Sequence, residues 1–87
     1  MGDRLSGKLD KVTQLWFDEP IKEIISEREP ASIGKVYLRD LLIERKPELA
    51  VWFDDRYIAH CVTTSMYKLG YVYQSKRKKT FWRADLL

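Results

Sequence analysis

The sequence predicts an α+β fold, a winged helix-turn-helix in which three helices are followed by a β-hairpin wing. Two observations predict it. Apolar residues recur at helical spacing as far as Leu69, and beyond it two short aromatic segments flank the four cations of residues 76–79. The first pattern is typical of helices that bury one face, and the second of strands joined by a polar turn. We expect one domain over residues 9–87, preceded by a flexible segment at residues 1–8.

The first helical pattern begins near Leu9 and is interrupted by Pro20. Because proline lacks an N–H, it is tolerated best in the first turn of a helix. We therefore predict that a separate helix begins with Asp18 as its N-cap and runs to Arg28, before Pro30. The alternative is one helix that bends at Pro20.

The middle of the chain predicts a helix over residues 35–46, which Pro47 ends. The shorter piece before it, residues 31–34, is expected to be a connector or a brief strand. The piece after it, residues 48–53, is expected to be an apolar turn that anchors the next helix. The apolar face of the helix is formed by Val36, Leu38, Leu41, Leu42 and Ile43.

The third helix is predicted over residues 55–69. Asp54 is a suitable N-cap, and Gly70 can adopt the left-handed conformation that commonly follows a helix. The apolar side of this helix carries Ile58, Cys61, Val62 and Leu69, with Met66 at its edge.

The hairpin is predicted from strands at residues 71–74 and 80–84, with the basic run at residues 76–79 between them. Four consecutive cations cannot enter a packed core without a large desolvation cost, so they must face water or an anion. A basic hairpin tip can contact a phosphate backbone without reading bases. The alternative interpretation of this run is a solvated loop that binds nothing. The alternative to the winged-helix fold is a three-helix bundle with a disordered basic tail. Aromatic residues on both sides of the run argue against a disordered tail.

Charge is divided unevenly along the chain. Residues 1–55 carry 9 Lys and Arg against 12 Asp and Glu, a net of −3, whereas residues 56–87 carry 7 against 1, a net of +6. Such a split predicts an electrostatic footprint on one face. We expect double-stranded DNA as the partner. The alternatives are a protein or a second copy bound through the acidic N-terminal half, and RNA or a single strand bound by stacking on Tyr71, Tyr73 or Trp82.

The candidate nucleic-acid contacts lie on the expected recognition helix, residues 55–69, and on the wing, residues 74–80. The helix face opposite the apolar residues is polar, aromatic and nearly free of acids, and its side chains can donate hydrogen bonds to phosphates or base edges. An ordinary solvated helix face is the alternative. The face lacks the Asn, Gln and Arg cluster of a base reader, which leaves sequence specificity open. The candidates are Arg56, His60, Thr63, Thr64, Tyr67, Lys68, Lys76, Arg77, Lys78, Lys79 and Arg83.

No catalytic residue, metal or cofactor is expected. His60 and Cys61 are the only histidine and the only cysteine. Neighbouring helical residues point about 100° apart, which suits neither a metal site nor a Cys–His dyad. The sequence also lacks a Gly-rich phosphate loop, a GxSxG motif and zinc-ligand spacing. We predict that the protein is not an enzyme and that Cys61 is a small core residue.

Two pairs of adjacent aromatic residues call for separate interpretations. Trp16 and Phe17 cannot both face one core, so one of them is a candidate contact for a partner or an adjoining domain. Trp52 and Phe53 precede a helix and are interpreted as core residues, with an exposed protein-binding patch as the alternative.

The C-terminal part of the chain carries Leu69-Gly70-Tyr71, the cations of residues 76–79, and Phe81-Trp82-Arg83. Over residues 31–87 this pattern resembles the winged-helix domain that ends many primase–helicase proteins of phages, plasmids and the virulence-associated protein E group. The resemblance implies a DNA-binding appendage of a replication or mobile-element protein. The catalytic motifs of a primase or an ATPase do not occur here.

The expected location is the cytoplasm. A single cysteine allows no internal disulfide and fits a reducing compartment. No apolar run approaches the roughly 20 residues that cross a bilayer. The first residues lead into polar sequence without a visible secretory signal, and no membrane partner is expected.

Overall fold

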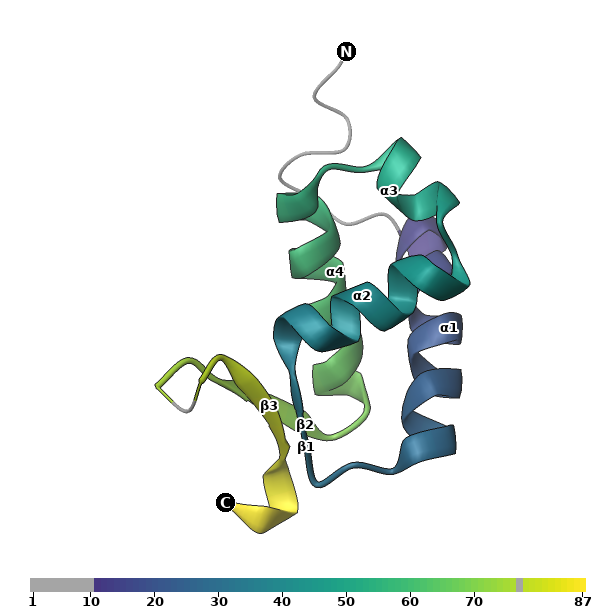
Figure 1. The fold of residues 1–87 in the computed structure, drawn as a ribbon. Helices are drawn as coiled ribbons and strands as arrows, with labels where there is room; N and C mark the ends of the chain where they lie inside the picture. Colours follow the sequence, from purple (N-terminus) through teal and green to yellow (C-terminus); the bar gives the residue numbers. More distant parts are fainter. Residues whose placement is uncertain (1–10, 77) are drawn as a thin grey trace.

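The computed structural model describes residues 11–76 and 78–87, which form an α+β fold with four helices and a three-stranded antiparallel sheet (Figure 1). This arrangement is compatible with a winged-helix-like fold. The expectation for residues 1–8 and the expected helix start at Leu9 lie outside the described residues. In order, the elements are α1 (Lys11–Arg28), β1 (Ser32–Gly34), α2 (Lys35–Arg45), α3 (Glu48–Trp52), α4 (Asp55–Lys68), β2 (Tyr71–Gln74), β3 (Thr80–Arg83) and the 3-10 turn η2 (Ala84–Leu86).

The predicted helix break before Pro20 is wrong, because α1 runs without interruption from Lys11 to Arg28. Proline inside a helix removes one backbone hydrogen bond and costs about 3 kcal/mol. Here the ring of Pro20 is fully buried, and its apolar contacts offset part of that cost. Asp18 does not cap a helix. Its carboxylate instead accepts hydrogen bonds from side chains of α1 and α4.

The segment before α2, which was expected to be a connector or a brief strand, is a strand. β1 pairs with β3, and β3 pairs with β2, so β3 lies in the middle of the sheet. Phe81 on β3 is opposite Ile33 on one side and Tyr73 on the other. Cross-strand partners share a face of a sheet, and this face covers the core, where Phe81 is completely buried. The last strand ends at Arg83, one residue earlier than predicted, because Ala84 begins η2.

A short helix, α3, replaces the predicted turn after Pro47. Leu49 and Phe53, four residues apart on the same side of this turn of helix, are buried. Val51 and Trp52 are exposed instead. The interpretation of Trp52 and Phe53 as core residues is therefore right for Phe53 and wrong for Trp52.

The predicted helix over residues 55–69 is confirmed as α4, one residue shorter. The side chain of Asp54 accepts a hydrogen bond of 2.8 Å from the backbone N–H of Tyr57, and Gly70 has φ +89°. The position of Met66 was predicted wrongly, because it is fully buried and Leu69 is only partly so. The buried face of α4 consists of Ile58, Cys61, Val62, Ser65 and Met66.

Cys61 is a core residue, as predicted. Its side chain is completely buried, and burial raises the pKa of the thiol to about 11, although a hydrogen bond with Tyr57 opposes that rise. Thiolate is the reactive form of cysteine.

We expect the thiol of the folded protein at pH 8 to react with a disulfide reagent at least ~100-fold more slowly than the thiol of the urea-unfolded chain, because far less thiolate is present.

We also expect Cys61→Ser to lower the free energy of unfolding by about 1 kcal/mol or more, through a buried hydroxyl. Absorbance kinetics and urea titrations measure the two effects. Equal reaction rates in the folded and unfolded protein would contradict the burial.

Candidate nucleic-acid interface

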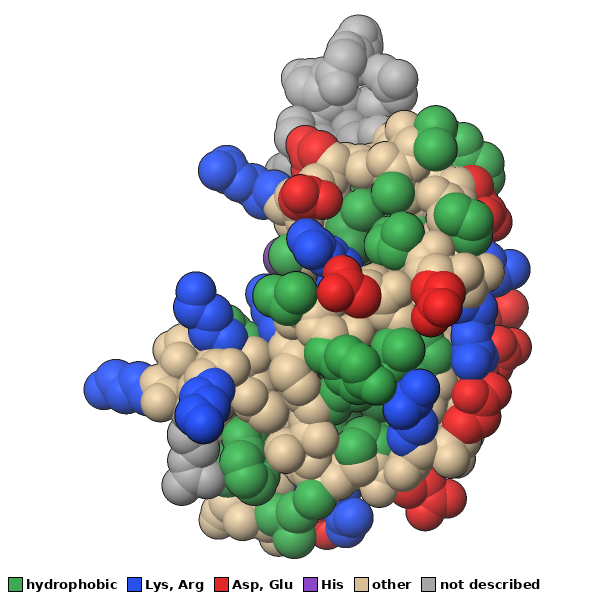
Figure 2. Space-filling model, viewed as in Figure 1, with side chains coloured by type: hydrophobic (Ala, Val, Ile, Leu, Met, Phe, Trp, Pro, Cys, Tyr) green, Lys and Arg blue, Asp and Glu red, His purple; other side chains and the backbone are tan. Residues whose placement is uncertain are grey.

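The wing is formed by β2, β3 and the turn between them. Lys76, Lys78 and Lys79 are exposed there, while Arg77 lies outside the described residues. None of these three lysines forms an ion pair within the described part of the chain. In Figure 2 cations project from the left edge of the molecule, where Figure 1 places the hairpin. The wing therefore presents a set of charges available to an anion.

The backbone holds the wing tip in an uncommon conformation. Lys78 and Lys79 have φ values of +60° and +51°, in the left-handed region that residues with side chains rarely occupy. The N–H of Lys79 donates to the carbonyl of Ser75 (3.3 Å), and the hydroxyl of Thr80 donates to the carbonyl of Lys78 (3.0 Å). The N–H of Lys35, the first residue of α2, donates to the carbonyl of Lys79 (3.0 Å). These contacts position the lysines rather than leaving them on a free loop.

Lys35 adds a cation beside the wing that the sequence patterns did not reveal. Its ammonium lies 4.7 Å from the centre of the Tyr73 ring, and burial lowers the pKa of Lys35. The pairing of β1 with β3 brings these distant residues together. The only sequence signal was the possible strand at residues 31–34.

The polar face of α4 carries two kinds of side chain: exposed ones, and ones whose hydroxyl already donates a hydrogen bond to the helix backbone. Arg56, His60 and Tyr67 are exposed, as predicted for a face that meets a partner. Thr63 and Thr64 are only half-exposed, and their hydroxyls donate to the backbone carbonyls of the residues four positions earlier, at 3.0 and 3.1 Å. The helix therefore offers hydrogen-bond donors mainly from Arg56, His60 and Tyr67.

Two predicted phosphate contacts are already paired with carboxylates. The ammonium of Lys68 lies 2.8 Å from Asp18, and the guanidinium of Arg83 lies 2.8 Å from Asp85. Exposed ion pairs such as Arg83–Asp85 are worth little, so a phosphate could compete for Arg83. Lys68 is less available, because its partner Asp18 is mostly buried. Neither one is as available as the lysines of the wing.

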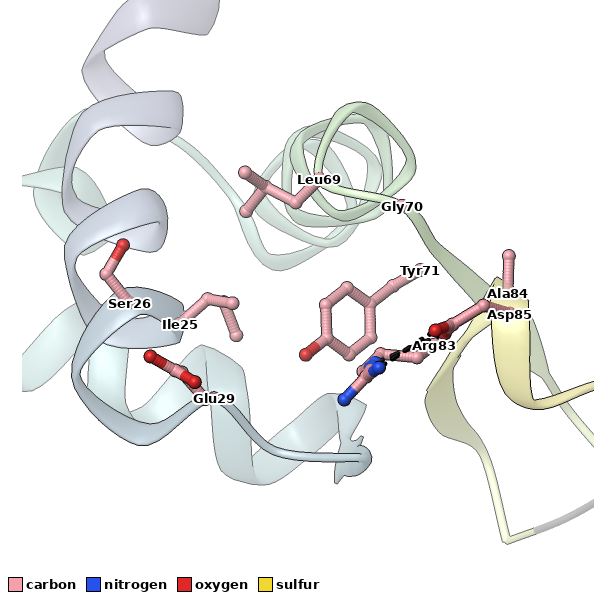
Figure 3. Close-up of a pocket in the computed structure, with 9 residues that line it drawn as sticks. All are labelled: Ile25, Ser26, Glu29, Leu69, Gly70, Tyr71, Arg83, Ala84 and Asp85. Carbon is pink, nitrogen blue, oxygen red and sulfur yellow. Dashed lines mark hydrogen bonds and ion pairs between the residues drawn. The ribbon is translucent and has the colours of Figure 1, made fainter.

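Arg83 also lies away from the wing tip. In the β2–β3 register it is opposite Tyr71, whereas Thr80 and Gln74 form the pair nearest the tip. Figure 3 shows Arg83 in a separate open cavity of about 710 Å³ between the end of α1 and the end of the chain. The cavity combines apolar residues with the Arg83–Asp85 pair and the exposed Glu29. The structure thus separates Arg83 from the other predicted cations.

A polar network centred on Asp18 joins α1 to α4. One oxygen of Asp18 accepts hydrogen bonds from Gln14 (2.9 Å) and Ser65, and the other from Lys68 (2.8 Å). Gln14 also donates to Ser65 (2.8 Å) and to the carbonyl of Cys61 (3.1 Å). Burial raises the pKa of Asp18. The hydrogen bonds from Gln14, Lys68 and Ser65 and the charge of Lys68 together lower this pKa by more than burial raises it, so the net shift is downward. The network holds the side of α4 that carries Ser65 and Lys68 against α1.

The two candidate surfaces meet at Gly70, which joins α4 to β2. In the view of Figures 1 and 2, α4 lies above the wing, and the surface is hollowed between the wing and the start of α4. Within the described residues, no group of three or more His, Cys, Asp and Glu is arranged to hold a metal ion. In the same part of the chain, every helix is too short or too polar to cross a membrane.

Comparison with known proteins gives no match to a protein-family model, to a curated protein or to a solved structure. The resemblance to primase–helicase winged-helix domains therefore stays a prediction.

We expect Asp18→Asn to lower the free energy of unfolding at pH 7 by about 1–2 kcal/mol, because it weakens charge-assisted hydrogen bonds. Since the pKa of Asp18 is lower in the folded chain, the stabilisation is complete above its unfolded value, near pH 4, and is lost as the pH falls through the folded value. Urea titrations between pH 7 and pH 3 should show the difference between the two proteins shrinking with acid.

The control for this variant is Asp40→Asn, which removes an exposed carboxylate that lies 3.5 Å from Arg39. It should change stability by less than about 0.5 kcal/mol. Equal losses in the two variants would contradict a special role for Asp18.

Proposed function

We propose that this protein is a winged-helix module that binds double-stranded DNA, with α4 as the recognition helix and residues 74–80 as the wing. The observation that carries the proposal is the exposed group of lysines at positions 76, 78 and 79, which have no carboxylate partner among the described residues. Positioned cations of this kind match a phosphate backbone.

The dimensions of α4 suit a major groove. Its 14 residues span about 21 Å, and a groove about 12 Å wide admits a helix. Asp54 and Asp55 are exposed at its N-terminus, where they would repel phosphates. The wing follows the other end of α4 in the chain, through Gly70. We therefore expect the C-terminal half of α4, around Tyr67, to lie closer to DNA than the N-terminal half.

Two of the three aromatic residues named for the single-strand alternative are poorly placed to stack on a base. Tyr71 is buried, and its hydroxyl donates to the carbonyl of Pro30. The ring of Tyr73 is covered by Lys35 and lies 5.3 Å from the ring of Phe81. Base stacking needs an accessible ring face, which leaves only the partly buried Trp82 for this alternative. We therefore favour duplex DNA. The resemblance noted above supports a role as the DNA-binding appendage of a cytoplasmic replication or mobile-element protein.

We expect Lys76→Gln together with Lys78→Gln to weaken binding to every duplex by at least about tenfold at low salt, because the loss of two phosphate contacts removes sequence-independent attraction. The log–log salt slope should flatten by up to about 1.8. Fluorescence anisotropy with a labelled duplex measures both effects. The matched control is Lys22→Gln with Lys46→Gln, which removes the same charge from exposed positions on α1 and directly after α2. Equal affinities for the wing and control variants would refute the role of the wing.

We expect Tyr67→Ala to leave the fold intact, because this side chain is exposed. If α4 reads bases, the variant should lose about 1–3 kcal/mol of discrimination between a preferred duplex and a shuffled one. The preferred duplex is first selected from a random library with the unaltered protein. Unchanged affinity for both duplexes would place Tyr67 outside the interface.

A further inference from the structure

The surface of α1 and α3 carries an apolar patch that DNA binding does not use. We call Leu15 and Trp16 of α1, with Val51 and Trp52 of α3, the tryptophan patch. Their exposed fractions are 52%, 45%, 81% and 54%. The rings of Trp16 and Trp52 lie 5.4 Å apart, so the two helices present one continuous aromatic surface. In Figure 2, green side chains lie over α3 at the upper right.

The core does not require these residues to be apolar. Phe17 and Phe53, the neighbours of the two tryptophans, are buried and pack 5.6 Å apart. Exposed clusters of large apolar side chains are a common mark of protein–protein interfaces, and tryptophan is the residue most enriched among their anchors. The patch is therefore a candidate docking surface.

The charges beside the patch indicate what it docks. Glu19 follows Trp16 by three residues on α1, and Glu48 precedes Trp52 by four on α3, so each carboxylate lies on the same helix face as its tryptophan. Both are exposed, and neither forms an ion pair with a described residue. The patch is apolar at its centre and acidic at its rim.

We propose that the tryptophan patch binds a protein partner through an apolar helical segment bordered by Lys or Arg. Apolar side chains would cover Trp16 and Trp52, and the cations would meet Glu19 and Glu48. The acidic rim disfavours nucleic acid. It also disfavours a two-fold dimer through this patch, because each Glu would face the same acidic surface on the second copy. In Figure 1, α3 and the wing lie at opposite ends of the molecule, so this protein partner and DNA can bind together.

The probes are two labelled helical peptides with the same leucine stripe, one bordered by lysines and the other by glutamates. We expect the full chain to bind the lysine peptide at least about tenfold more tightly than the glutamate peptide in an anisotropy titration. Glu19→Lys with Glu48→Lys should reverse that preference. Equal affinity for the two peptides, or no binding of either one, would overturn the proposal.

Trp52→Ala should weaken binding of the lysine peptide at least about tenfold, because it removes an anchor and leaves the core untouched. The matched control is Tyr37→Ala, which removes a 51% exposed aromatic residue on α2 and should bind the peptide like the parent. Equal losses in the two variants would contradict the proposed site. Duplex binding should be the same in Trp52→Ala as in the parent, so a failure of this proposal is distinct from a failure of the DNA proposal.

Two other occupants are tested in parallel. Sedimentation of the chain as a dimer that Trp52→Ala converts to a monomer would assign the patch to a second copy. Residues 1–10 contain Leu5 and Leu9 beside Arg4 and Lys8, a composition that matches the proposed partner. Peptide binding that occurs only after this segment is removed would assign the patch to the chain itself. Either result would overturn the proposal.

Discussion

The polar contact between α1 and α4 constrains the arrangement of the candidate interface. Asp18 is mostly buried, and a carboxylate in that position is costly unless hydrogen bonds satisfy it. The side chains that donate hydrogen bonds to Asp18 come from both helices. All of these bonds form at the rotation of α4 about its own axis that the structure shows. That rotation turns Cys61, Val62 and Met66 into the core. It leaves Arg56 and the rest of the polar face outside.

The pairing of β1 with β3 makes the wing a part of the folded domain. A two-stranded hairpin alone is marginally stable in water, and a third strand with a buried face supports it. Here Phe81 supplies that buried face, and Ile33 lies beside it from β1. The same pairing brings Lys35 to the wing, where its N–H holds the backbone of Lys79. A backbone held by such hydrogen bonds loses less entropy on meeting a fixed array of phosphates than a free loop does.

Local signals in the sequence were enough to predict most elements but few of the contacts between them. Asp54 and Gly70 mark the ends of α4 through chemistry that acts within a few residues. Pro20 was misleading, because its tolerance inside α1 depends on burial against distant parts of the chain. The pairs Asp18–Lys68 and Lys35–Tyr73 join residues 50 and 38 positions apart, and no local pattern encodes them. The tryptophan patch was predictable in part, because two adjacent aromatic residues on a helix cannot both face one core.

The central claim is that duplex DNA meets the wing and the outer face of α4, while α1 and α3 stay free. Amide chemical shifts of the ¹⁵N-labelled protein, followed while a short duplex is added, test it most directly because they report every surface at once. We expect shifts for residues 75–79 and for the exposed positions of α4 around Tyr67, with the indole N–H signals of Trp16 and Trp52 unmoved. Shifts centred on the two tryptophans, or an unchanged spectrum at a large excess of duplex, would contradict it.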